Sequence, residues 1–395
     1  MRIDVRRWSA ALVSALAVLG LVGLGGPVSA ATTPSVPWTW GGNSYGELGD
    51  GTTTARPTPG PVIGLRDVVD IHGGREHVIA LRADGTVWVW GSNVQGQLGL
   101  GTTANVSRPT RVPGLSGITA VESGHNHSLA LTATGTVWAW GLNADGQLGD
   151  GTTVRRRSPV RVSGLTNAVA IAAGRDMSYA VRADGTVVGW GRNAEGQLGD
   201  GTTTRRLTPV RVGTLTDVVG LAGGRDHGLA LRSDGSVWGW GANAYGQVGD
   251  GTLVNRTSPV QVLTAGVAEL AAGAHHSYAL RTDGRVWAWG RNYRANLGDG
   301  TTRTRRTPVL VRGVSGAVSI GSGRDHGLAV LADGTVRAWG YNAGGQLGDG
   351  TTLNRSTAVT VPGVAHAVKA GGGGQAYSVV LVDAGTATPA AAPPR

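Results

Sequence analysis

The order of apolar and polar residues along the chain predicts short β-strands separated by glycine-rich turns. One segment, 168–212, shows the pattern well, because its apolar runs are brief and each ends at a turn signal. The four expected strands are 168–172, 178–182, 186–190 and 209–212. The last is headed by Pro209, which suits an outer edge. We therefore expect four antiparallel strands in this segment.

The connections between these strands carry their own turn signals. Asp184-Gly185 predicts a two-residue hairpin in which both central residues have positive φ. The loop 193–203 is rich in glycine, and we expect Asn193 to hydrogen-bond the main chain while Leu198 fills space beneath the loop. The loop lacks the alternating carboxylates of a calcium site and the lysine of a phosphate loop.

The same segment recurs along nearly the whole chain. The second tryptophan of a W-x-W motif recurs at a spacing of 50 residues five times and 49 once, at Trp40, Trp90, Trp140, Trp190, Trp240, Trp289 and Trp339. Val188 and Arg337 replace the first tryptophan of the motif in two copies. A fixed period of this length indicates a repeat architecture, and four antiparallel strands per repeat are typical of a propeller blade. We interpret these tryptophans as packing residues between blades, where large indoles meet small residues.

The first and last copies are incomplete and complement each other. Trp40 is not preceded by the first two strands of a blade, whereas the copy from 367 to 383 has those two strands and then stops. We expect strands at 36–40 and 61–63 to join them, which leaves no long free edge. The prediction is an all-β, seven-bladed β-propeller of four-stranded antiparallel blades over 31–383, closed by N- and C-terminal strands in one shared blade.

The two ends and the composition bear on where the protein works. Residues 1–30 have a basic start, an apolar run and a small-residue end, which predicts a signal peptide and a secreted protein with no membrane span after its removal. Residues 384–395 are rich in Ala and Pro and are expected to be disordered. The chain has no Cys, so we expect no disulfides. Its net charge of +10 favours a protein partner with an acidic surface, and we do not expect the partner to be nucleic acid. We expect a monomer.

No motif for catalysis or metal binding stands out from the repeat. His77, His127, His227, His276 and His326 share one repeat position that Met177 and Ala376 fill elsewhere, which favours packing or a local hydrogen bond. The chain has no nucleophile elbow and no H-E-x-x-H segment. We therefore expect no enzyme activity, no cofactor and no metal.

Candidate binding residues cluster on one predicted face. Alternate connections of an antiparallel blade lie at opposite ends, so the G-x-x turns and the N-x-x-G loops share a face, which we call the turn face. Its variable residues are Arg75, Glu76, His125, Asn126, Arg175, Asp176, Arg225, Asp226, His275, Arg324 and Asp325, with Tyr45, Tyr245 and Tyr293 in the loops. Either each arginine pairs with a carboxylate of its own or the adjacent blade, or these residues bind a partner.

A second periodic charge precedes the outer strands. Arginines recur there in six copies, and Val106 takes the place in the remaining one; the six are Arg56, Arg156, Arg206, Arg256, Arg305 and Arg355. They either clamp the glycine-rich loop through carbonyl bonds, which we favour, or form a basic outer band that meets acidic wall polymers.

The repeat resembles that of the regulator of chromosome condensation family. The resemblance rests on A-G-x-x-H-S-x-A-L, D-G-T-V-W-x-W-G and N-x-x-G-Q-L-G-D-G, and it covers about 36–383. It implies a seven-bladed propeller with a shared closing blade, here in a secreted bacterial member. The architecture is also similar, more distantly, to the type II β-lactamase inhibitory protein.

The residues and the resemblance together leave four candidate functions, of which we favour the first. The favoured function is that of a secreted, non-enzymatic protein-binding scaffold that docks a partner through the turn face. The alternatives are a structural protein associated with the cell wall or a polysaccharide, an inhibitor of a secreted hydrolase, and guanine nucleotide exchange. The last is disfavoured because no copy contains the inserted wedge that the family's exchange factor uses.

Overall fold

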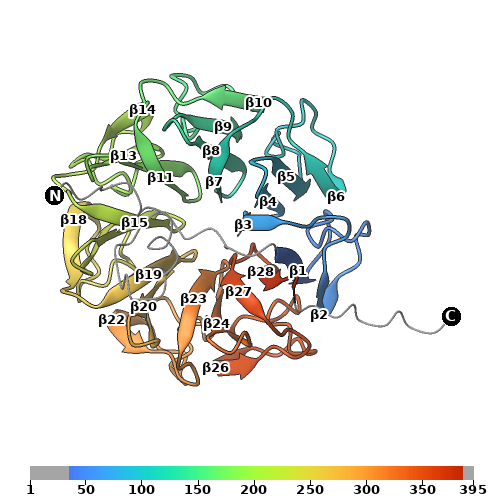
Figure 1. Ribbon diagram of the computed structural model, residues 1–395. Helices are drawn as coiled ribbons and strands as arrows, with labels where there is room; N and C mark the ends of the chain where they lie inside the picture. Colours follow the sequence, from blue (N-terminus) through green and yellow to red (C-terminus); the bar gives the residue numbers. More distant parts are fainter. Residues whose placement is uncertain (1–34, 386–395) are drawn as a thin grey trace, which may run out of the picture.

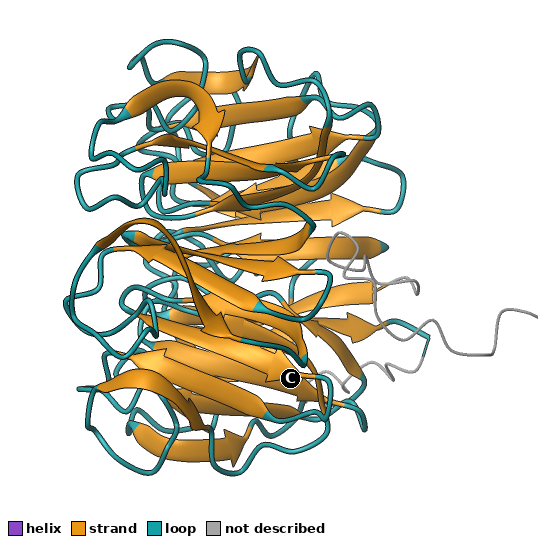
Figure 2. Cartoon of the chain, turned by 90° about the vertical axis from the view of Figure 1, so that its left-hand side faces the viewer, coloured by secondary structure: helices purple, strands orange, loops and turns teal. Residues whose placement is uncertain are grey.

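The computed structural model describes residues 35–385 as a ring of seven blades around a central axis (Figure 1). The predicted signal peptide, 1–30, and residues 386–395 of the predicted tail lie outside the described part. All regular structure in the described part is β, and the strands run between two faces that carry the connecting loops (Figure 2). Within 35–385 no helix is long and apolar enough to cross a membrane.

Each blade is a four-stranded antiparallel sheet whose first strand lies nearest the axis. Blade 1 contains β3 (Val68–Gly73), β4 (His77–Arg82), β5 (Val87–Gly91) and β6 (Val106–Arg111). Blade 2 contains β7 (Ile118–Ser123), β8 (His127–Thr132), β9 (Val137–Gly141) and β10 (Arg156–Arg161). Blade 3 contains β11 (Ala168–Ala173), β12 (Met177–Arg182), β13 (Val187–Gly191) and β14 (Arg206–Arg211).

The next three blades repeat this order. Blade 4 contains β15 (Val218–Gly223), β16 (His227–Arg232), β17 (Val237–Gly241) and β18 (Arg256–Leu263). Blade 5 contains β19 (Val267–Ala272), β20 (His276–Arg281), β21 (Val286–Gly290) and β22 (Arg305–Leu310). Blade 6 contains β23 (Ala317–Ser322), β24 (His326–Leu331), β25 (Val336–Gly340) and β26 (Arg355–Thr360).

Blade 7 is shared by the two ends of the chain, as predicted. It contains β27 (Ala367–Ala370) and β28 (Tyr377–Asp383) from the C-terminal end, and β1 (Ser35–Gly41) and β2 (Arg56–Pro61) from the N-terminal end. β1 pairs with β28 in unbroken antiparallel register from Ser35 opposite Asp383 to Gly41 opposite Tyr377. A further bridge between Ser35 and Val68 links this blade to blade 1. The N- and C-terminal strands therefore close the ring.

Two details of the predicted strands are wrong. The outer strand of blade 3 begins at Arg206 rather than at Pro209, and that of blade 7 spans Arg56–Pro61 rather than 61–63. Proline is tolerated inside β14 because its register with β13 shifts between Gly189 and Gly191, so Pro209 has no paired residue opposite it. In the Asp184-Gly185 turn only Gly185 has positive φ, at 75°. The turn contains one residue more than predicted, because the Gly185 amide donates to the carbonyl of Arg182.

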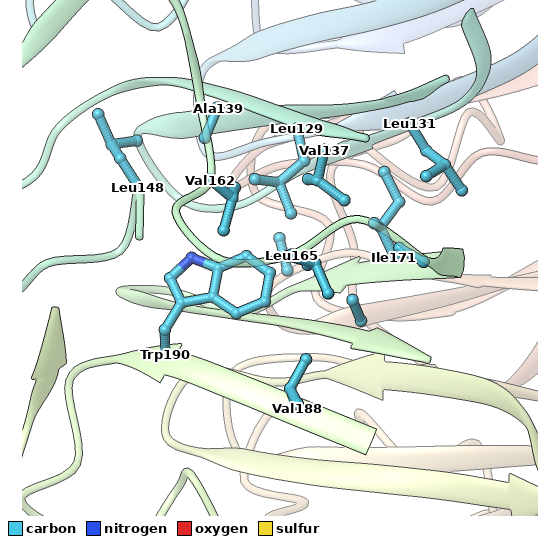
Figure 3. Close-up of a cluster of buried hydrophobic side chains, with 13 residues drawn as sticks. Leu129, Leu131, Val137, Ala139, Leu148, Val162, Leu165, Ile171, Val188 and Trp190 are labelled. Atoms are coloured by element: carbon cyan, nitrogen blue, oxygen red, sulfur yellow. The ribbon is translucent and has the colours of Figure 1, made fainter. Parts of the chain in front are cut away.

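The seven second tryptophans of the W-x-W motifs are fully buried between blades, as predicted. Trp190 of blade 3 packs with Val188 against Leu148 and Val162 of blade 2 (Figure 3). Its Nε1 donates a hydrogen bond of 2.9 Å to the carbonyl of Gln147 in the preceding blade. Gly149 allows this approach, since a Cβ there would lie 2.8 Å from the indole. The indole therefore supplies both the apolar contact and the polar contact of the junction.

The recurring histidines have the structural role that the sequence suggests. His127 is fully buried, and its Nε2 lies 2.9 Å from Oγ of Ser178 in the next blade. Ser178 in turn donates to the carbonyl of Gln147, so it accepts from the histidine. The ring covers Gly124, where a Cβ would lie 2.1 Å from Cε1 of His127.

Where the histidine is replaced, its partner is replaced as well. In the blade after Met177, Gly228 stands at the repeat position of the serine, and the Tyr179 hydroxyl supplies the missing donor to the carbonyl of Gln197. Likewise, Ala376 stands at the histidine position of blade 7, and Val78 stands at the serine position of blade 1. These paired replacements show that the repeat position specifies the contact between neighbouring blades.

The arginine clamp is present, but its acceptor differs from the prediction. Nε of Arg206 donates to Oδ2 of Asp200 at 2.8 Å, a carboxylate rather than a carbonyl. Equivalent pairs occur at Arg156, Arg256, Arg305 and Arg355, whereas Arg56 donates to the carbonyl of Thr39. In blade 1 both members are apolar, Leu100 and Val106, and they pack on one cluster. The Asn193 and Leu198 predictions are confirmed, since Asn193 bonds the main chain at Thr202 and Leu198 is fully buried.

The buried histidines make stability depend on pH. Burial lowers the pKa of His127 to about 3, against about 6.5 in an unfolded chain. Its contribution to stability is therefore complete above pH ~6.5 and is lost as the pH falls from there toward 3. His127→Gln keeps a donor toward Ser178 but cannot titrate. Urea unfolding between pH ~6 and ~4 should show that this variant lowers the slope of unfolding free energy by about 1.4 kcal/mol per pH unit.

His366→Gln is the matched control for this measurement, because His366 is exposed. Its slope should equal that of the wild type. Equal slopes for the His127 variant and the wild type would show that His127 is not held neutral in the fold.

Candidate functional site

The seven G-x-x turns meet around the axis on the turn face and are joined by main-chain hydrogen bonds. In each turn an amide donates to a carbonyl in the turn of the next blade, and the seven bonds close on themselves. They run from the amides of Arg75, His125, Arg175, Arg225, Ala274, Arg324 and Gln375. Their lengths are 3.0 to 3.3 Å, and the bond from Gln375 to the carbonyl of Arg75 completes the cycle. We call this set the turn ring.

The first variable residue of each turn lines a hollow inside the turn ring. The hollow has a volume of about 290 Å³, and its side chains include Arg75, His125, Arg175, Arg225 and Arg324. The two remaining blades contribute Ala274 and Gln375. The structure therefore brings the predicted arginines and His125 together at the axis.

The second variable residue of each arginine turn pairs with that arginine. Nε of Arg175 lies 3.0 Å from Asp176, and the corresponding distance is 3.3 Å in Arg225–Asp226. Arg75–Glu76 at 3.3 Å and Arg324–Asp325 at 3.5 Å complete the set. Of the two predicted roles for these arginines, pairing with a carboxylate is the one seen in the structure. The paired arginine side chains are still 28 to 41% exposed.

Neighbouring blades hold the carboxylates in place. Asp176 accepts from Gln147 and Asp226 from Gln197, each across a blade junction. Asp325 accepts from Asn296 in the same way. Burial raises the pKa of Asp176, against the opposing effect of Arg175. In the turn of blade 2, where His125 stands in place of an arginine, Nδ2 of Asn126 lies 3.5 Å from Nδ1 of His125.

Two of the three predicted loop tyrosines meet in a partly exposed cluster over blades 4 and 5. The rings of Tyr245 and Tyr293 lie 6.1 Å apart and edge to face, and His275 lies 5.1 Å from Tyr245. The Arg291 guanidinium covers both tyrosines, at 5.5 and 5.2 Å from their ring centres. Tyr45 belongs to blade 7, and within 35–385 it makes no aromatic or cation–π contact.

The cluster extends to blade 6 through residues that the sequence analysis did not single out. Arg294 lies 4.0 Å from the centre of the Tyr341 ring and 3.4 Å from Asp325. We call Tyr245, His275, Arg291, Tyr293, Arg294 and Tyr341 the tyrosine–arginine patch. A signal for it was present, because the loop starting at Asn292 departs from the repeat. Ala295 stands there in place of glycine, with a φ of 63°.

Below the turn face, the innermost strands carry a buried charge network. Lys369 on β27 pairs with Asp70 on β3, across the junction of blades 7 and 1. His72 lies 3.1 Å from Asp70 and 3.4 Å from Glu122 on β7. Burial alone would raise the pKa of Asp70, but the charges of Lys369 and His72 outweigh it and hold this pKa below its usual range. Lys369 is the single lysine of the chain.

The innermost strand of blade 5, β19, carries a further buried carboxyl group, Glu269. Burial raises the pKa of Glu269 to about 7. Its carboxylate accepts from the Ile320 amide at 3.1 Å, in the next blade. Among the described residues no group of three His, Asp or Glu side chains is arranged to hold a metal ion. The contacts of Lys369, Asp70, His72 and Glu122 join blades 7, 1 and 2.

Comparison with known proteins agrees with this geometry. A sequence model of the RCC1-like domain matches residues 36–380. The chain belongs to the RCC1-like domain family. Among curated protein sequences, no relative matches it.

Solved structures similar to this RCC1-like domain have the same fold. Prp20p from Saccharomyces cerevisiae, described with its binding to Gsp1p and histones, is 25% identical, with a TM-score of 0.79 over 90% of this chain and 93% of that one. Human WBSCR16 is 25% identical, with a TM-score of 0.78 over 88% and 99% of the two chains. Yeast RCC1 bound to Kap60 is 24% identical, with a TM-score of 0.80 over 89% and 90%.

Removing one member of the buried Lys369–Asp70 pair should lower stability more than removing the charges of both. Lys369→Met leaves Asp70 buried with only His72 as a cationic partner, and it should lower the free energy of unfolding by about 3 kcal/mol. Adding Asp70→Asn removes the uncompensated charge, so the double variant should recover at least about 1 kcal/mol of that loss. Guanidinium chloride unfolding of the four proteins of the cycle measures both values. Additive effects of the two substitutions would show that the pair is not coupled.

Proposed function

We propose that this RCC1-like domain is a secreted, non-enzymatic scaffold that binds a protein partner through the turn face, with the tyrosine–arginine patch at the centre of the interface. The observation that carries the proposal is the patch itself. Tyr293 is 60% exposed, yet its ring is held by Arg291 and Tyr245. Tyrosine and arginine dominate the binding energy of protein interfaces, and a preordered ring loses little entropy on binding.

Charge supports a partner with acidic side chains at this position. Arg291 and Arg294 lie on the patch, and within 35–385 the one ion pair of either residue is that of Arg294 with Asp325. Stacking on tyrosine leaves guanidinium N–H groups available for a carboxylate. The similarity to Prp20p, described as binding Gsp1p, fits a protein-binding role for the fold.

The other functions suggested by the sequence lack a comparable observation. The arginines proposed as a basic outer band are mostly engaged with aspartates of their own blades, which weakens the case for binding acidic wall polymers. Hydrolase inhibition stays a prediction from resemblance. Guanine nucleotide exchange has no insertion to support it in the described residues, since the loops before the outer strands have the same length in every blade.

The test is capture of a partner from the secreted proteins of the source organism on immobilised protein. Arg291→Ala together with Tyr293→Ala should weaken binding of the captured protein by about 30-fold or more, because both residues are at the centre of the expected interface. Affinity is then measured by surface plasmon resonance with the purified partner.

Val169→Ala together with Arg182→Ala is the matched control, because both residues lie toward the opposite face, near the Asp184-Gly185 turn. This control should bind as the wild type does. Capture of a specific partner that the patch variant retains at full affinity would overturn the assignment of the patch.

A further inference from the structure

The hollow inside the turn ring has the features of a binding site separate from the tyrosine–arginine patch. All seven blades contribute residues to its wall, and glycines such as Gly74, Gly124 and Gly174 are among them. Its volume of about 290 Å³ is near the lower end of small-molecule sites. The turn ring fixes its outline, because each turn is hydrogen-bonded to the next.

Four arginines face this hollow with donors to spare. In the ion pairs of Arg75, Arg175, Arg225 and Arg324 the closest nitrogen is Nε in every case. Among residues 35–385 no hydrogen bond from their Nη atoms is found, whereas the Nε of Arg75 donates to Gln375. A guanidinium has five N–H donors, so each of the four has unused donors at its outer end.

The paired carboxylates orient these arginines and lie beneath them. The side chains of Asp176, Asp226 and Asp325 are 5 to 12% exposed, whereas those of their arginines are 28 to 41% exposed. A ligand that enters from solvent therefore meets the guanidinium groups before the carboxylates. The second bond of each carboxylate, to the preceding blade, prevents the pair from rotating as a unit.

The positive charges converge on one place despite these pairs. The pKa of His125 is lowered to about 3, first by burial and then by Arg75, Arg175, Arg324 and Arg225. His125 is thus neutral at pH 7, and all four arginines are close enough to act on it. Ser123 adds an Oγ in the lining that is buried and has no partner among the described residues.

We propose that the hollow binds a small polyanion, a compact molecule that carries two or more phosphate or carboxylate groups. Guanidinium groups bind both kinds of oxyanion through paired N–H donors. Several anionic groups are needed because the four arginines come from blades 1, 3, 4 and 6 and so surround the axis. Ser123 and His125 complete the site with a hydroxyl and a neutral ring. The inference does not depend on the proposed docking role of the patch.

Isothermal titration of the purified protein with pyrophosphate and with citrate at low ionic strength tests the inference. At least one of the two should bind, and the tighter one identifies phosphate or carboxylate as the preferred group. Arg175→Gln with Asp176→Asn removes one arginine without leaving its carboxylate unpaired, and it should weaken binding at least about tenfold. Arg225→Gln with Asp226→Asn should do the same, and it provides a second measurement if the first variant does not fold.

Arg211→Gln is the control for long-range charge effects, because it removes one positive charge from an exposed position on β14 that does not line the hollow. Its affinity should stay within about twofold of the wild type. Proton NMR locates the ligand: the ring signals of His125 should shift on titration, and those of exposed His366 should not. Absence of binding by both anions, or equal losses in the control and hollow variants, would overturn the proposal.

Discussion

The turn ring is the constraint on which the rest of this structure depends. One amide in each blade must reach a carbonyl in the next, and the seventh bond, from Gln375 to Arg75, closes only if the blades are spaced evenly around the axis. The pairing of β1 with β28 supplies the same closure further from the axis. Because both closures join the two ends of the chain, the position of every variable turn residue depends on the whole ring.

The junctions between blades meet this constraint with a few interchangeable contacts. At most junctions a serine and a tryptophan donate to one loop carbonyl of the preceding blade, and the serine accepts from a histidine, as Ser178, Trp190 and His127 do at Gln147. At two junctions, where Gly228 and Gly327 replace the serine, the hydroxyls of Tyr179 and Tyr278 reach that carbonyl instead. His276, which has lost its serine at the second of these, lies 3.2 Å from Ser322. The contact is thus maintained while the residues that make it change.

Much of the fold could be predicted from the sequence because each repeat encodes its own turns and its own packing residue. The spacing of Trp40 to Trp339 predicted the blades, and the incomplete end copies predicted the shared blade. Errors arose where geometry depends on the partner strand. The register shift in blade 3 placed Pro209 inside β14, and Asp184 has no positive φ because its turn has one more residue than expected.

The candidate site was predicted less completely, since side chains from different blades meet only once the ring has closed. The arginines of the turns were recognised from their repeat position, but their convergence around His125 depends on the radius of the turn ring. Arg291 and Tyr341 share one repeat position, but its residue changes from copy to copy, and Arg294 stands at another position, so no periodic signal joined the three. A departure at Ala295 was visible, yet only the structure shows that it lies beside these residues.

Amide hydrogen exchange of the turn-ring residues tests the closed ring most directly. The account predicts that the amides of residues 75, 125, 175, 225, 274, 324 and 375 exchange at similarly slow rates, because each is bonded to the next blade. Exchange at Gln375 more than about a hundredfold faster than at the other six would show that the seventh junction opens independently. That result would contradict both the closed ring and the fixed outline of the hollow that it surrounds.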